Sequence, residues 1–157
     1  MVYSATITTE AATVEEAPLV TNVKVTKGVL YRFEIYFPPG PSGLVGVQIR
    51  YHDQQLYPVQ RDEWFIGDNV TIGFDDLYGV DTPPFIFEIR TYNVDTDYDH
   101  LVQLRMAIVS QEEYMAKSGA FSDIDKLAQL LVDIEDRTKA ANSMSVADAR
   151  EVVRGDV

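Results

Sequence analysis

The residue types best suited to chemistry stand in the segment DTDYDH, which begins at Asp95. Asp95, Asp97 and Asp99 recur there at every second position, and His100 follows them. Calcium prefers oxygen ligands, and calcium loops use this D-x-D-x-D spacing. An EF-hand, however, requires a glycine at the position of His100 and an acidic residue at the position of Met106. The sequence therefore leaves open a calcium site and a solvated acidic turn between two strands.

Aromatic side chains form the second candidate site. The chain has 9 Tyr, 7 Phe and 1 Trp, several of them in the segment YHDQQLYPVQRDEWF. Tyr51, Tyr57 and Trp64 could together form a platform on which sugar rings stack. The alternative is that these rings anchor the core or an interface, because aromatic side chains bury a large apolar area and still satisfy one polar group.

Residues with the types and spacing of an active site are not found in the sequence. Adjacent acids such as Asp75-Asp76 would point to opposite faces of a strand, whereas a glycosidase needs two carboxylates facing across a cleft. His52 neighbours Asp53, but no serine stands in the context of an activated nucleophile. The chain contains no cysteine, which excludes thiol chemistry and Cys-ligated zinc. We therefore expect a non-enzymatic protein without a required cofactor.

The charge balance limits the partners that this protein can have. Lys and Arg number 13 and Asp and Glu number 25, which gives a net charge of −12. Nucleic acids and anionic membranes are bound mainly through clustered Lys and Arg, so neither is expected as a partner. The N-terminal segment lacks a basic leader and an apolar run, and no stretch is long enough to span a bilayer. A cytoplasmic location, or assembly in the cytoplasm into a particle, is expected.

From Leu19 to Val109 the hydrophobic pattern has a period of two, which indicates β-strands buried on one face. In the first long run, the residues predicted to face inward are Val29, Tyr31, Phe33, Ile35 and Phe37. Turn sequences rich in Pro, Gly, Asp and Asn separate the runs, as in PPGPSG and GDN. Seven or eight short strands without an intervening helical period predict an antiparallel β-sandwich, in either a jelly-roll or another Greek-key order.

Segments with different patterns flank the expected sandwich. Residues 1–18 contain few large apolar side chains and are interpreted as an extended N-terminal arm. This arm could stay flexible or add a strand to a sheet edge of its own or a neighbouring subunit. Residues 19–109 form the sandwich domain, and residues 110–157 form a small helical C-terminal module.

The C-terminal module contains an apolar stripe. Ile124, Leu127, Leu131 and Ile134 are separated by alternating steps of three and four, so they share one face of a helix. A single helix of this length is marginal in water, so the stripe requires a partner. The partner could be the sandwich itself, the same helix of another subunit or a different protein, and these four residues are the candidate interface.

The order VLYRFEIYFPPGPSGLVGVQI, QLYP, DEWF and PFIFEIRTYNVD resembles small uncharacterised proteins found among the virion structural genes of tailed bacteriophages. The resemblance implies a β-sandwich subunit attached to a capsid or tail, such as a decoration protein, and it carries over no functional residue. The expected function is therefore that of a virion structural subunit, whose partners are other copies of the chain or a capsid or tail lattice. The alternative is a carbohydrate-binding module that uses its surface aromatics.

Overall fold

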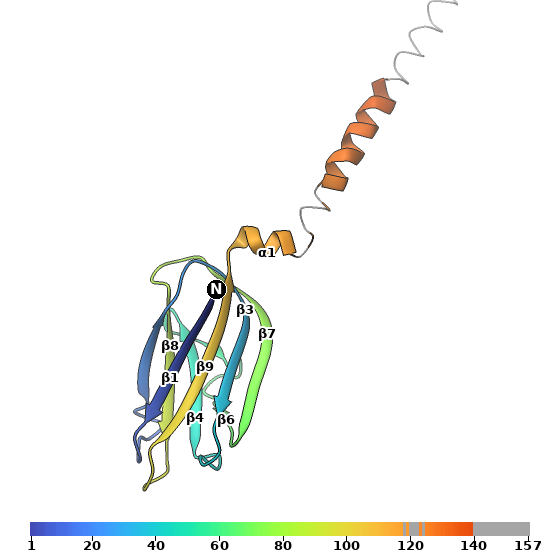
Figure 1. The fold of residues 1–157 in the computed structure, drawn as a ribbon. Coiled ribbons are helices and arrows are strands. Elements are labelled where there is room, and N and C mark those ends of the chain that lie inside the picture. The colour runs from blue at the N-terminus through green and yellow to red at the C-terminus, as the bar shows by residue number, and fades with distance from the viewer. Residues whose placement is uncertain (118, 120–122, 124, 140–157) are drawn as a thin grey trace, which may run out of the picture. The chain divides into compact units, whose positions relative to one another are not determined.

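The computed structural model describes residues 1–117, 119, 123 and 125–139. The chain divides into two compact units, Met1–Gln111 and Glu112–Val157. In the first unit, two antiparallel sheets pack face to face, so the predicted β-sandwich is confirmed (Figure 1). The division between the units falls beside the predicted boundary at Ser110.

One sheet has the strand order β1-β9-β3-β7, and the other has the order β2-β8-β4-β5, with β6 also paired to β4. The strands of the first sheet are β1 (Val2–Thr9), β9 (His100–Val109), β3 (Gly28–Phe37) and β7 (Val70–Val80). The strands of the second sheet are β2 (Leu19–Lys24), β8 (Ile86–Asn93), β4 (Val45–Tyr51), β5 (Gln54–Tyr57) and β6 (Phe65–Ile66).

These pairings follow from one long antiparallel hairpin that has been rolled up. Along the hairpin, β1 pairs with β9, β2 with β8, β3 with β7, and β4 with β5 and β6. Rolling brings β3 against β9 and β4 against β8. This is the strand order of a jelly roll, one of the two possibilities that the sequence leaves open.

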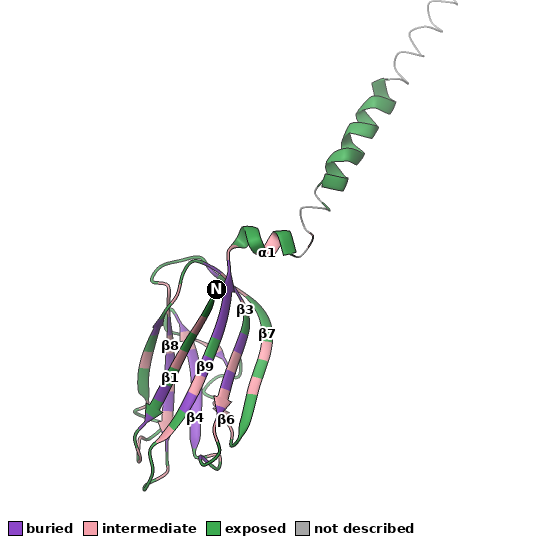
Figure 2. Ribbon diagram, in the orientation of Figure 1, coloured by how far each residue is buried: buried purple, intermediate pink, exposed green. Residues whose placement is uncertain are grey.

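The core lies between the two sheets and is filled by alternate side chains of their strands. Figure 2 colours the ribbon by burial and shows the class changing along the strands. In β8, for example, every second residue is buried. The largest fully buried side chains are Phe33, Phe37, Phe87, Leu30, Ile35, Ile49, Ile89, Leu104, Met106, Ile108, Val45 and Val47. The polar residues between them face outward, so any ligand-binding surface of the sandwich lies on an outer face or in a loop.

A β-bulge changes the predicted alternation in β3. The register against both neighbouring strands shifts between Leu30 and Arg32. Tyr31 is an extra residue relative to β9, whereas in the pairing with β7 the extra residue lies on β7, between Asp75 and Tyr78. Leu30 is therefore buried, at 1% exposure, whereas Val29 and Tyr31 are only partly buried. The predicted inward face is correct from Phe33 onward and wrong before it, because the extra residue reverses the side-chain direction.

The first 18 residues do not form a separate arm. β1 pairs with β9 along its whole length, and its residues Ile7 and Thr9 are buried at 3% and 0% exposure. The predicted domain boundary after residue 18 is therefore wrong, since the sandwich unit begins at Met1. Of the arrangements that the sequence left open for this segment, the structure shows a strand added to the edge of a sheet of the same chain.

Among the described residues, two helical segments follow the sandwich in the sequence. α1 spans Gln111–Lys117, with Glu112 and Glu113 in its first turn and Lys117 in its last, a placement that the helix dipole favours. A further helix includes residues 125–139. None of the described helices is both long and apolar enough to cross a membrane.

Replacing Ile7 tests the role of β1. Ile7→Ala should lower the free energy of unfolding by about 2–5 kcal/mol, because it removes buried methyl groups and leaves a cavity. Urea denaturation of the full chain measures this change. Val2→Ala on the same strand, where the side chain is 70% exposed, is the control and should change stability by less than about 0.5 kcal/mol. Equal effects of the two substitutions would contradict the docking of β1.

Candidate functional site

The apolar stripe on the helix at 125–139 is exposed. Leu127, Leu131 and Ile134 are 60%, 65% and 58% exposed, and Leu130 beside them is 56% exposed. Ile124, the fourth residue of the predicted interface, lies outside the described residues. The three that can be placed form an apolar stripe that the described residues of their own unit do not bury.

The carboxylate of Asp95 is used by its own loop. Oδ1 accepts hydrogen bonds from the backbone N–H groups of Asp97, at 2.9 Å, and Tyr98, at 3.3 Å. Oδ2 lies 2.9 Å from Nε2 of His100. Two hydrogen bonds hold the pKa of Asp95 below its ordinary value. The bond from the amide of Asp97 has the larger effect, and the bond with the imidazole of His100 has the next largest. The charged form of Asp95 therefore stabilises the turn.

The other predicted calcium ligands do not converge on Asp95. Oδ1 of Asp99 accepts a hydrogen bond from the backbone N–H of Ala11, at 2.8 Å, and so ties the loop to the segment after β1. Among the described residues, no three His, Asp or Glu side chains are grouped closely enough to hold a metal ion. The geometry of Asp95, Asp97 and Asp99 is that of a hydrogen-bonded turn between β8 and β9.

The predicted aromatic platform is not formed, because two of its three rings lie in the core. Tyr51 and Tyr57 are 5% and 4% exposed. The Tyr51 hydroxyl donates to the carbonyl of Thr82 at 2.7 Å, and that of Tyr57 donates to Asp76 at 2.5 Å. Burial raises the pKa of both tyrosines. These rings are therefore core anchors, as in the alternative interpretation.

Trp64 is the one predicted sugar-stacking residue near the surface, and its neighbours hold it in place. Its Nε1–H donates to Oε1 of Glu15 at 2.7 Å. Its ring meets the ring of Tyr92 edge to face, with centroids 4.9 Å apart. The Tyr92 ring lies so close to Gly46 that a methyl group there would overlap it. Glycine at position 46 is thus needed for this aromatic pair.

Trp64 also lines a groove of about 350 Å³. The groove lies on the outer face of the sheet β2-β8-β4-β5, where Gln48, Arg50 and Arg90 line it together with acidic residues. The alternation of the sequence placed these residues on outward faces. The alternation could not predict that Arg50 and Arg90 lie near each other, because their proximity depends on the register between β4 and β8.

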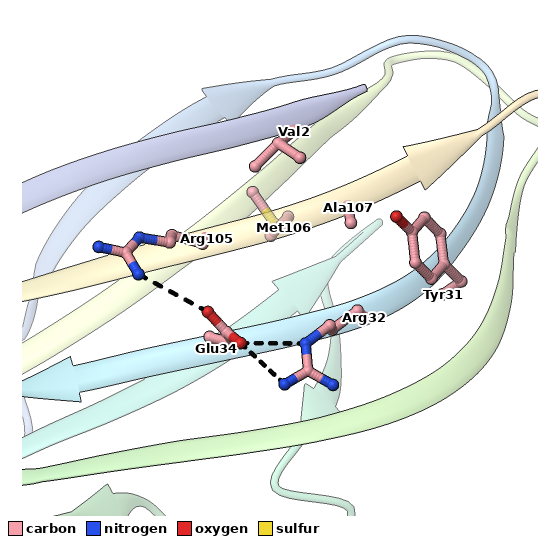
Figure 3. A pocket seen from close by; sticks show the side chains of 7 residues that line it. All are labelled: Val2, Tyr31, Arg32, Glu34, Arg105, Met106 and Ala107. Atoms are coloured by element: carbon pink, nitrogen blue, oxygen red, sulfur yellow. Dashed lines mark hydrogen bonds and ion pairs between the residues drawn. The ribbon is translucent and has the colours of Figure 1, made fainter.

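A smaller hollow, of about 160 Å³, lies on the other sheet (Figure 3). There the carboxylate of Glu34 faces Arg32 at 2.8 Å and Arg105 at 3.8 Å, and Arg32 also pairs with Asp75. Each of these two arginines therefore has a carboxylate partner. The network is solvent-exposed, so we expect it to contribute little to stability.

Comparison with models of protein families gives no match to this chain, and comparison with curated proteins gives none either. The functional assignment therefore depends on the geometry of the sites and on the resemblance seen in the sequence.

The pH dependence of stability tests the Asp95 turn. The pKa of Asp95 is lower in the folded than in the unfolded chain. The charged carboxylate therefore stabilises the fold at any pH above the unfolded pKa of about 3.9. This stability is lost as the pH falls through the folded pKa. Asp95→Ala should therefore lower the melting temperature at about pH 5, and the difference from the native chain should shrink towards about pH 2. Circular dichroism melts measure both temperatures.

Asp97→Ala is the matched control, because its carboxylate accepts no hydrogen bond within the described chain. This substitution should change the melting temperature little at any pH. A deficit of Asp95→Ala that persists unchanged in acid would contradict the role of the carboxylate charge.

Proposed function

We propose that the protein is a non-enzymatic structural subunit of a virion, attached to the capsid or tail, and that it assembles through its C-terminal helix. The exposed stripe of Leu127, Leu131 and Ile134 carries this proposal. Isolated helices of this length are marginal in water, and most helical stability in proteins comes from packing an apolar face. The stripe is therefore suited to a contact with another helix.

Other copies of this chain are the partner that the stripe fits best. In a heptad that begins at Ile124, Leu131 takes position a and Ile134 takes position d. Leucine at a with isoleucine at d favours assemblies of more than two helices, whereas the preceding heptad, with Ile124 at a and Leu127 at d, favours dimers. Leu130 at position g widens the apolar surface beyond the seam of a dimer. We therefore expect a homo-oligomer.

The fold of the sandwich is compatible with the virion location but does not require it. Jelly rolls occur in viral capsid domains and also in lectins and cupins, so the fold alone does not fix the function. The resemblance to phage structural proteins, carried by residues 20–109, favours the capsid or tail among these.

A substitution within the stripe tests the assembly. Leu131→Asp should reduce the mass in solution to that of one chain, 17.7 kDa, because a buried unpaired carboxylate in a helix interface is strongly unfavourable. Light scattering after size exclusion measures this mass, for the native chain and for the variant. Gln129→Asp, on the same helix but outside the stripe, is the control and should leave the oligomer intact.

The same samples show which part of the proposal fails. A monomeric native chain, or an oligomer that survives Leu131→Asp, would contradict assembly through the stripe. Loss of the strand signal in circular dichroism on Leu131→Asp would place that residue in the core of the sandwich. Absence of the chain from purified particles, examined by mass spectrometry, would contradict the virion location.

A further inference from the structure

The groove on the outer face of the sheet β2-β8-β4-β5 contains two arginines with unused hydrogen-bonding capacity. Across β4 and β8, Gln48 pairs with Arg90 and Arg50 pairs with Glu88, so the arginines are diagonal neighbours on adjacent strands. Nε of each arginine is shielded from solvent and has no acceptor within the described chain. A guanidinium group offers five N–H donors, and buried donors without a partner are unfavourable.

Arg50 also lacks a carboxylate within ion-pair distance among the described residues. Its Nη2 donates to the backbone carbonyl of Asp53, and no carboxylate among the described residues pairs with it. Among the described carboxylates, Arg90 reaches only that of Glu88, at 3.4 Å. The sandwich unit's other arginines, Arg32, Arg61 and Arg105, all form ion pairs with carboxylates. Since like charges on neighbouring strands repel, an anionic group in the groove would relieve both arginines at once.

The walls of the groove are built before any ligand arrives. Gln55 donates to the carbonyls of Pro58 and Gln60, at 2.7 Å each, and accepts from the N–H of Asp62 at 2.9 Å. These bonds hold the loop between β5 and β6, which supplies one wall. The other wall is the segment before β2, and the bond between Trp64 and Glu15 joins the two walls. A preformed site loses little conformational freedom on binding.

The lining selects the kind of anion. Glu15, Glu16 and Asp62 line the same groove as the arginines. These acids repel densely charged anions such as nucleic acids and polyphosphates, but they can accept hydrogen bonds from hydroxyl groups. A ligand that fits both features carries separated carboxylates among many hydroxyls.

The groove continues into a second hollow, as a site for a chain molecule would. At Arg50 and Asp62 it adjoins a second hollow of about 390 Å³, which Gln54 and Gln55 also line. We infer that this face of the sandwich binds an acidic oligosaccharide, a chain of uronic acid type, with one sugar carboxylate held by Arg50 and Arg90. The site belongs entirely to the sandwich unit, so it does not depend on assembly through the helix.

Calorimetric titration of the full-length protein with tetragalacturonate and with a glucuronate oligomer of the same length tests this inference. At least one oligomer should bind, and its carboxyl methyl ester should not. Arg50→Gln should weaken binding at least about tenfold, because a hydrogen bond to a charged group is lost. Arg50→Lys keeps the positive charge but loses the planar guanidinium group with its paired N–H donors. This variant should retain part of the affinity.

Arg105→Gln, which removes the same charge from the other sheet, is the matched control and should bind like the native chain. Arg90→Gln provides a second test if Arg50→Gln alters the circular dichroism spectrum. The inference is overturned if neither oligomer binds, if the methyl ester binds equally well, or if both groove variants keep full affinity. Binding of a peptide with a free C-terminal carboxylate in preference to the sugars would assign the groove to protein chain ends instead and would also overturn it.

Discussion

The apolar core buried between the two sheets determines most other features of the sandwich. Side chains from both sheets, among them Phe33, Ile49, Ile89 and Leu104, meet there at 0–1% exposure. Since successive residues of a strand point to opposite faces, burying one face fixes the register of every strand and sends the remaining residues outward. The groove and the smaller hollow both lie on these outer faces, so their geometry is a consequence of the core.

A few buried polar groups connect the sheets and shape the loops. Thr9 on β1 donates to Thr91 on β8 at 2.7 Å, which links one sheet to the other. Asn93, at 0% exposure, donates to the carbonyls of Thr9 and Tyr98 and accepts from the N–H of Asp95. The acidic loop is thus attached to the core by satisfied hydrogen bonds, as buried polar groups generally are. The carboxylates of Asp95 and Asp99 accept hydrogen bonds that hold the turn, which explains why a calcium-like spacing is found without a cluster of metal ligands among the described residues.

The two surfaces proposed for recognition differ in chemistry, and each suits its proposed partner. Chains with a net charge of −12 repel one another, so contact between copies requires an apolar surface such as the helix stripe. The groove, in contrast, is polar and contains Arg50, which forms no ion pair with a carboxylate of the described residues. An overall acidic protein can hold an anion there only because Arg50 and Arg90 are concentrated at one point of the sheet.

Hydrophobic periodicity and turn residues act locally, and they were enough to predict the strands between Leu19 and Val109, the β-sandwich and the apolar stripe of the C-terminal helix. Tertiary structure alone decided the jelly-roll order, the pairing of β1 with β9, the bulge at Tyr31 and the burial of Tyr51 and Tyr57. It also decided the meeting of Arg50 with Arg90. Each of these depends on cross-strand register between segments far apart in the chain, and periodicity along a single strand carries no information about its neighbour.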